Sequence, residues 1–143
     1  MTDAGKTTGY PGTAENESTM KFNHMDLQVS DVHAARTFFE THFGLRCVYA
    51  RGDEIALLDD GSGFSFGVSN LFQSPAPLYP PDFHIGFVRE DAAEVEAIYE
   101  RLKAAGVVIR NALAQGGPNL YFTCLGPDRI PVEVRAPLKT KAA

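Results

Sequence analysis

Two histidines occupy matching positions in two similar stretches of this sequence. His24 precedes Asp31 by seven residues, and His84 precedes Asp91 by the same spacing, sixty residues further along the chain. In each stretch the histidine begins a strand-like run and the aspartate begins a helix-like run. Neutral imidazole is the commonest metal ligand in proteins. The repeat therefore places two side chains that can bind a metal at equivalent positions.

A third candidate ligand, Glu133, lies between Val132 and Val134 in the last strand-like run. Strand alternation puts it on the face opposite the two valines, and strands disfavour glutamate. Two imidazoles and one carboxylate at a cleft would bind a divalent transition metal and leave positions for substrate. Each residue also has a simpler reading. A histidine at a strand start is more often a surface or hydrogen-bonded residue, and Glu133 could pair with Arg135 or Arg110.

Weaker candidates share faces with these three residues. Asp26 and Gln28 alternate with His24 and could orient a ligand, or could be polar residues at a rim. Tyr121 could donate a hydrogen bond to a substrate oxygen or act as a catalytic acid, although buried tyrosines usually have a packing role. Arg135 could bind a substrate carboxylate or hold the glutamate in place. Aromatic residues that suit a flat or apolar small molecule, or equally a core, are Phe64, Phe66, Phe72, Phe83 and Phe122.

The surrounding pattern predicts two copies of a βαβββ unit, in residues 21–70 and 82–136. In the first copy Met25, Leu27 and Val29 alternate with polar residues, which is typical of a strand. Asp31 can cap the following helix, and Gly44 can end it. We expect strands at 22–30, 45–51, 54–59 and 64–70, and then at 83–89, 107–113, 120–125 and 130–135.

One short helix cannot cover both faces of a four-stranded sheet, so neither copy is expected to be stable alone. Two copies side by side would bury their helix-facing surfaces and leave the opposite faces curved around a cleft. The sequence thus predicts an α+β fold of paired βαβββ modules forming an open barrel-like cleft.

The segments outside the two modules have different compositions. Residues 71–81 contain four prolines and read as a linker, whose apolar side chains could cover a pocket or a subunit contact, or pack on their own core. Residues 1–20 show no periodicity and read as a flexible N-terminal extension. We treat residues 21–138 as a single domain.

Composition and charge narrow the class of protein. The chain has 143 residues and a net charge of −5, which argues against nucleic acid or an anionic membrane as partner. No apolar run is long enough to span a membrane, and no signal peptide is visible. Cys47 and Cys124 are far apart, which favours free thiols in a reducing cytoplasm. We expect a cytoplasmic protein.

Three segments of the chain resemble the vicinal oxygen chelate superfamily, the glyoxalase, bleomycin-resistance and extradiol-dioxygenase group. They are NHMDLQVSDVHAARTFFETHFGL, DFHIGFVREDAAEVEAIYERLKAAGV and YFTCLGPDRIPVEV. The resemblance implies a paired βαβββ fold, a homodimer, and a divalent ion such as Fe, Mn, Ni or Zn. It places His24, His84 and Glu133 at three of the family's four metal positions.

The chain departs from the family pattern at the fourth ligand position. Alignment of the turns puts Ser65 there, or Gly67 if the register slips, and neither is a good ligand for such an ion. The three remaining candidate ligands, His24, His84 and Glu133, resemble the 2-His-1-carboxylate triad of Fe(II) extradiol dioxygenases. Arg129 stands where that subgroup has Gly or Pro, and no obvious acid–base histidine follows.

Two classes of function follow from this set of residues. The first is a metal-dependent dioxygenase, lyase or isomerase that chelates neighbouring oxygens of a small oxygenated or aromatic metabolite. Tyr121 is then the candidate catalytic residue, and the substrate-binding candidates are Asp26, Gln28, Ser65, Phe66, Phe122 and Arg135. The second is a metal-free small-molecule or antibiotic-binding protein of the resistance type. The retained His, His and Glu favour the enzyme.

Overall fold

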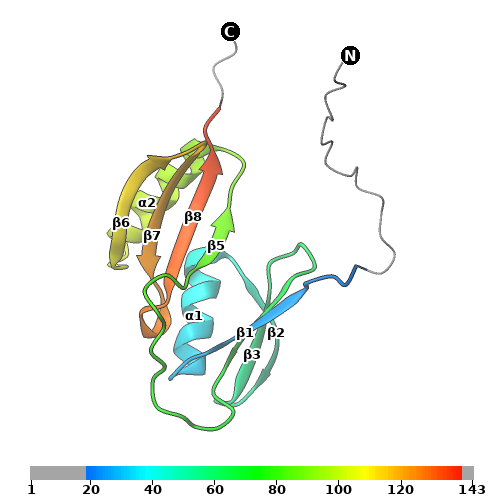
Figure 1. Ribbon diagram of the computed structural model, residues 1–143. Helices are drawn as coiled ribbons and strands as arrows, with labels where there is room; N and C mark the ends of the chain where they lie inside the picture. Colours follow the sequence, from blue (N-terminus) through cyan, green and yellow to red (C-terminus); the bar gives the residue numbers. More distant parts are fainter. Residues whose placement is uncertain (1–18, 140–143) are drawn as a thin grey trace, which may run out of the picture.

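The computed structural model describes residues 19–139, which form two four-stranded sheets and two long helices (Figure 1). The first sheet has the order β1-β4-β3-β2 and the second has the order β5-β8-β7-β6. The elements of the first module are β1 (His24–Gln28), α1 (Val32–Phe43), β2 (Arg46–Arg51), β3 (Ile55–Asp59) and β4 (Ser65–Ser69). Those of the second are β5 (Ile85–Val88), α2 (Ala92–Ala104), β6 (Ile109–Gly116), β7 (Asn119–Leu125), the 3-10 turn η1 (Pro127–Arg129) and β8 (Pro131–Pro137).

The α+β fold of two βαβββ modules is confirmed, and the two sheets do not close into a barrel. The strand β6 extends three residues beyond the predicted end, as far as Gly116. It does so because the turn to β7 is shorter than expected. Gly116 already pairs with Asn119, and Gly117, with a φ of 56°, makes the tight bend.

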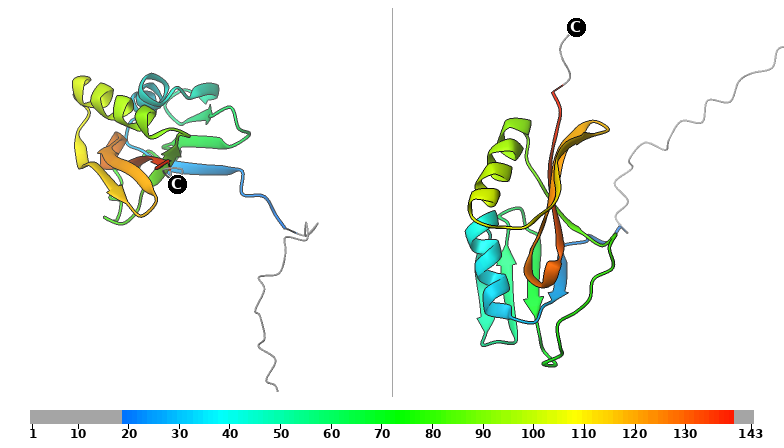
Figure 2. Two further views of the ribbon diagram at one scale, coloured as in Figure 1. Left: turned by 90° about the horizontal axis from the view of Figure 1, so that it is seen from above. Right: turned by 90° about the vertical axis from the view of Figure 1, so that its left-hand side faces the viewer.

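Both helices lie on the same side of the molecule, with the sheets on the other side (Figure 2). The two predicted caps are present. The Asp31 carboxylate accepts a hydrogen bond from the Ala34 amide at 2.9 Å, and the Asp91 carboxylate accepts one from the Ala93 amide at 3.0 Å. Gly44 ends α1 in the left-handed conformation, at a φ of 68°. Among the described helices, none is long and apolar enough to cross a membrane.

The helix α1 packs against both sheets through aromatic side chains. Phe39 is fully buried and meets Phe66 of β4 edge-on, at 4.9 Å between ring centroids. Phe43 stacks on Phe87 of β5 at 4.6 Å. Each such pair contributes about 0.5–1.5 kcal/mol of stability beyond the contribution from burying the surface of the rings. The second helix covers its own sheet, where Tyr99 packs on Phe122 at 5.2 Å.

The turn before β8 forms a second connection between the modules. Asp128 and Arg129 are both left-handed, with φ values of 53° and 61°. In this conformation the Asp128 carboxylate accepts hydrogen bonds from the Ser30 amide at 2.7 Å and the Ser30 hydroxyl at 2.6 Å. The end of β1 is thereby held against the start of β8.

Replacing Asp128 by Asn should lower the free energy of unfolding by about 1 kcal/mol, because one charge-assisted hydrogen bond is lost. Denaturant unfolding measures this change. Asp53→Asn, at an exposed position in the β2–β3 turn, is the matched control and should leave stability unchanged. Equal midpoints for wild type and Asp128→Asn would show that the contact does not hold the modules together.

The two cysteines should differ in reactivity. Cys124 is fully buried, and burial raises the pKa of its thiol to about 11, whereas Cys47 is half-buried. The folded state favours the protonated Cys124 thiol, so its contribution to stability is lost only as the pH rises through the range from about 9 to about 11. At pH 8 a disulfide reagent should modify the Cys47 thiol quickly and the Cys124 thiol only at the rate of unfolding. Loss of the fast phase in Cys47→Ser identifies the reactive thiol, and two fast phases in wild type would contradict the assignment.

Candidate functional site

Strand pairing determines which side chains share the open face of the first sheet, the face away from the helices. His24 pairs with Ser65, and Asp26 pairs with Gly67. Paired residues of neighbouring strands point to the same side, opposite to Met25 and Leu27, which face α1. The structure thus places the predicted residues His24, Asp26, Gln28 and Ser65 together on the open face.

In the second sheet the same face carries a row of interacting charged groups. Glu133 lies beside Gly86, two residues beyond His84. The Nε2 atom of His84 is 4.0 Å from one carboxylate oxygen of Glu133, and the Nη1 atom of Arg135 is 3.9 Å from the other. The Glu133 side chain is 22% exposed, whereas those of His84 and Arg135 are about half exposed. The glutamate is therefore held between two groups that can carry positive charge.

Tyr121 extends this row at the next strand. It pairs with Arg135 across β7 and β8, so its side chain also lies on the open face. Its ring covers Gly116, where a Cβ atom would come within 2.6 Å of the ring. The glycine therefore leaves room for the tyrosine in this position.

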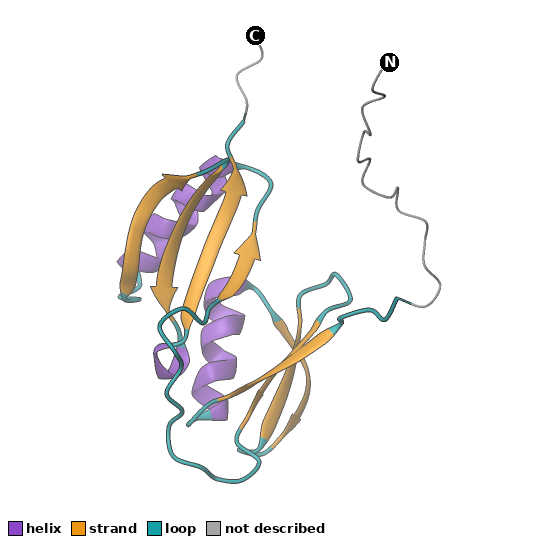
Figure 3. Ribbon diagram, in the orientation of Figure 1, coloured by secondary structure: helices purple, strands orange, loops and turns teal. Residues whose placement is uncertain are grey.

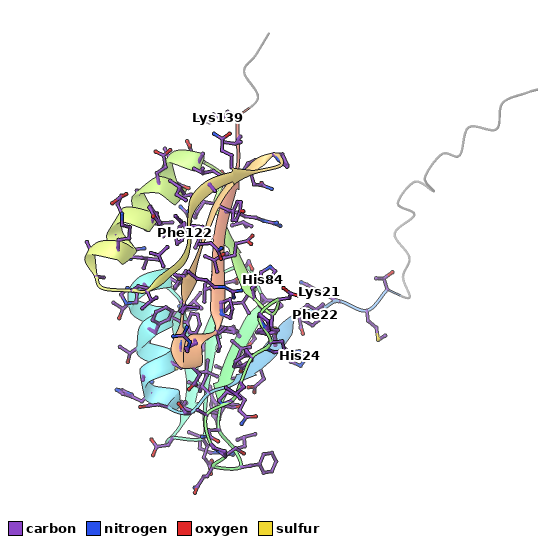
Figure 4. The ribbon with its side chains drawn as sticks, turned by 60° about the vertical axis from the view of Figure 1, so that its left-hand side comes forward. Lys21, Phe22, His24, His84, Phe122 and Lys139 are labelled. Carbon is purple, nitrogen blue, oxygen red and sulfur yellow. The ribbon has the colours of Figure 1, made fainter. Side chains whose placement is uncertain are left out.

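The candidate metal ligands are only partly assembled. Among residues 19–139, no group of three or more His, Cys, Asp and Glu side chains is close enough to hold a metal ion. His84 and Glu133 are neighbours, while His24 lies on the other sheet and contacts the Asn23 side chain at 2.9 Å. Figure 4 shows both histidines on the flank where the chain enters β1. The donors suit a divalent ion in their chemistry, and one imidazole and one carboxylate are already paired.

The position equivalent to Glu133 in the first sheet is Gly67, not Ser65. Glu133 pairs with the residue two after His84, and Gly67 pairs with the residue two after His24. Of the two positions that alignment of the turns allowed, the structure selects Gly67, and the two turns differ in conformation. The β3–β4 turn is bent by glycines 61 and 63, and the β7–β8 turn by Asp128 and Arg129.

Asp26 covers Gly67. Its Oδ2 atom is 3.1 Å from the place where a Cβ atom of residue 67 would lie, and its Oδ1 atom accepts a hydrogen bond from the Ser69 hydroxyl at 2.6 Å. Ser69 is almost buried, at 9% exposure. Sequence reasoning missed Ser69, although its alternation with Ser65 along β4 places it on the same face.

The Pro-rich linker runs from β4 to β5 (Figure 3) and contacts residues near the two candidate histidines. The Tyr79 hydroxyl donates a hydrogen bond to the Gln28 carbonyl, and its ring stacks on Phe83 at 5.0 Å. Burial, followed by the charges of Asp128 and Asp26, raises the pKa of Tyr79. Tyr79 therefore joins the end of β1 to the residue just before His84. Its position was not expected from sequence, because the linker has no periodicity.

A cavity of about 930 Å³ lies between the end of α1, the edge strand β5 and α2. It is lined mainly by apolar side chains, with His84, Arg89 and Arg101 among the polar ones. Phe66 lies at its wall but is 6% exposed and packs on Phe39. Phe122 is fully buried beneath α2, on the face away from His84, so its place is in the core rather than among ligand-binding residues.

Comparisons with known proteins agree with this architecture. The sequence matches the Glyoxalase/Bleomycin resistance protein/Dioxygenase superfamily over residues 21–134. No curated protein matches the chain. A solved structure of a possible glyoxalase from Bacillus cereus is 32% identical, covers 81% of this chain and 98% of its own, and has a TM-score of 0.69.

Two more distant structures share the fold alone. A lactoylglutathione lyase from Agrobacterium tumefaciens is 19% identical over 84% of this chain and 96% of its own, with a TM-score of 0.70. A glyoxalase/dioxygenase from Nostoc punctiforme is 16% identical over 95% of this chain and 100% of its own, with a TM-score of 0.69. Because the family match spans most of the sequence and both modules, the chain belongs to the glyoxalase, bleomycin resistance protein and dioxygenase superfamily.

Proposed function

We propose that this protein is a metal-dependent enzyme that acts on a small oxygenated or aromatic metabolite. The observation that carries the proposal is the pairing of His84 with Glu133 on the open face of the second sheet. These two residues would hold the ion, and His24, on the open face of the first sheet, would be the third ligand. When bound, a divalent ion would act as a Lewis acid toward two neighbouring oxygens of the metabolite. The reaction classes that this supports are a dioxygenase, a lyase or an isomerase.

The other side chains of the row would bind and orient the metabolite. Arg135 is half exposed and can donate hydrogen bonds to an oxygen or a carboxylate while it stays near Glu133. Tyr121, held over Gly116, can donate its hydroxyl proton to a substrate oxygen on the same face. Asp26, Gln28 and Ser65 would line the opposite wall.

A second candidate function is metal-free binding of a small molecule, as a resistance protein would do. The specific observation in its favour is the apolar cavity of about 930 Å³. This volume lies within the range of ligand pockets in proteins, which is about 300–1,000 Å³. The cavity and the His84–Glu133 pair adjoin, because His84 lines the cavity.

We expect untagged protein to contain near-stoichiometric iron, manganese, nickel or zinc by elemental analysis. His84→Ala and Glu133→Gln should each lower the ion affinity by at least about tenfold, since each removes a ligand. His33→Ala on α1 and Glu96→Gln on α2, both at exposed positions, are the matched controls and should keep the wild-type content. Absence of metal after anaerobic loading with Fe(II) would instead favour the metal-free binding protein.

The proposal extends to a homodimer, which the family resemblance implies, and to the cytoplasm, which the spacing of Cys47 and Cys124 favours. Light scattering of the full chain at micromolar concentration measures the oligomeric state. A monomer under these conditions would remove the dimer from the proposal without affecting the ion site.

A further inference from the structure

A smaller cavity, of about 280 Å³, lies between the proline-rich linker and the end of the second sheet. Leu125 and Pro131, which pair across β7 and β8, line it from the sheet. Pro77, Pro80 and Pro81 line it from the linker. Because proline fixes φ, this wall has little conformational freedom to lose when a ligand binds. The cavity shares no lining residue with the apolar cavity beside β5.

Two arginines of this cavity have no carboxylate partner among residues 19–139. The Arg110 guanidinium donates one hydrogen bond to the Pro81 carbonyl at 2.8 Å, which leaves its other N–H groups available. Arg129 is exposed, and within the same range its guanidinium makes no hydrogen bond or ion pair. Each of five other arginines pairs with a carboxylate, namely Arg36, Arg46, Arg51, Arg89 and Arg135. In a chain with a net charge of −5, two arginines left without an acid in one cavity suit an anionic ligand.

The backbone of Arg129 has a conformation in which glycine is the usual residue. Its φ of 61° lies in the left-handed region, which is unfavourable for a residue with a side chain. Backbone hydrogen bonds hold this turn, from the Arg129 amide to the Gly126 carbonyl and from the Ile130 amide to the Pro127 carbonyl. These bonds do not require an arginine. Unfavourable backbone conformations cluster at binding sites, so the guanidinium is the feature that this position retains.

The acidic side chain in the cavity wall, Asp128, is directed away from the two arginines. Its Oδ2 atom accepts a hydrogen bond from the Ser30 amide at 2.7 Å, and its Oδ1 atom accepts one from the Ser30 hydroxyl at 2.6 Å. Both oxygens therefore bond to the end of β1. The cavity holds two guanidinium groups against one carboxylate that already has its own partners.

Apolar side chains complete the cavity wall and narrow the class of ligand. Leu78 lines the cavity and is 98% exposed, and Leu125 is half-buried. A planar guanidinium matches the two oxygens of a carboxylate, and the leucines can cover an apolar body. Ligand sites commonly combine an apolar lining with a few charged groups in this way.

We propose that the cavity under the linker binds a small carboxylate, with Arg110 and Arg129 on its charged group and the two leucines on its apolar body. This site goes beyond the proposed function and does not depend on a bound ion. Pro131 and Glu133 lie two residues apart on one face of β8, about 7 Å along the strand. The carboxylate would thus bind close to the His84–Glu133 pair but on residues of its own.

Titration of the full chain with benzoate, followed by ¹H–¹⁵N NMR of the arginine Nε–Hε groups and the backbone amides, tests this inference. Benzamide has the same shape without the charge, and inorganic phosphate has the charge without the apolar body. We expect saturable shifts of the Arg110 and Arg129 signals with benzoate. Benzamide and phosphate should each bind at least about tenfold more weakly.

The variant Arg129→Gly separates binding from folding. It removes the guanidinium and suits the left-handed backbone, so the melting temperature should stay the same or rise while benzoate affinity falls at least about tenfold. Arg110→Gln should weaken benzoate binding in the same direction. Arg46→Gln, at an exposed arginine of β2 that pairs with Asp59, is the matched control and should bind benzoate like wild type.

Wild-type affinity in folded Arg129→Gly and Arg110→Gln would overturn the inference, as would equal binding of benzamide or no saturable shift with benzoate. Loss of binding in Arg135→Gln alone would assign the carboxylate to the row beside Glu133 and would refute the site under the linker. Phosphate binding as tight as that of benzoate would refute the role of the apolar wall. None of these results alters the metal content expected of the protein, so the ion site is tested separately.

Discussion

The packing of α1 across both sheets is the interaction on which the rest of the structure depends. Phe39 and Phe43 lie on one helix, and their ring partners lie on β4 of one sheet and on β5 of the other. Among the described residues the two sheets share no strand pairing, so their relation depends on these rings, together with contacts such as the hydrogen bonds that Asp128 accepts from Ser30. The candidate site residues on the open faces lie on the sheets that this packing positions.

The polar character of the open faces follows from strand alternation, because the apolar residues of the same strands pack against the helices. Along β1 the apolar residues face the helix and the polar residues face outward, so a histidine and an aspartate two positions apart project on the same side. The strand β8 repeats this arrangement with Glu133 and Arg135. The candidate site is therefore coupled to the core, because a shift of one residue in either strand would bury its polar side chains and expose its apolar ones.

The two modules and the strands that carry the candidate ligands could be predicted from the sequence. The repeated spacing of His24 and His84, with a capping aspartate after each, predicted both modules and the strands that carry the candidate ligands. The sequence left the position equivalent to Glu133 in the first module open between Ser65 and Gly67, because the choice required the register of β1 against β4. Turn residues are a poor guide to register when one turn uses glycines and the other uses left-handed Asp128 and Arg129.

The contributions of Tyr79 and Ser69 also depended on tertiary structure. A proline-rich segment has no periodicity that would place a given side chain, so the bond from Tyr79 to β1 could emerge only from the folded chain. Phe122 illustrates the opposite case. Its aromatic character fitted a ligand pocket, but alternation along β7 places it beneath α2.

The crowding between Asp26 and residue 67 has a consequence for how the two modules diverged from a common unit. If one unit was duplicated, one copy moved its acid from one strand to the neighbouring strand. The 3.1 Å contact means that the Asp26 carboxylate would have to shift by a few tenths of an ångström if residue 67 carried a side chain. Reconstructed ancestors of this sequence would show at positions 26 and 67 in which order the two residues changed.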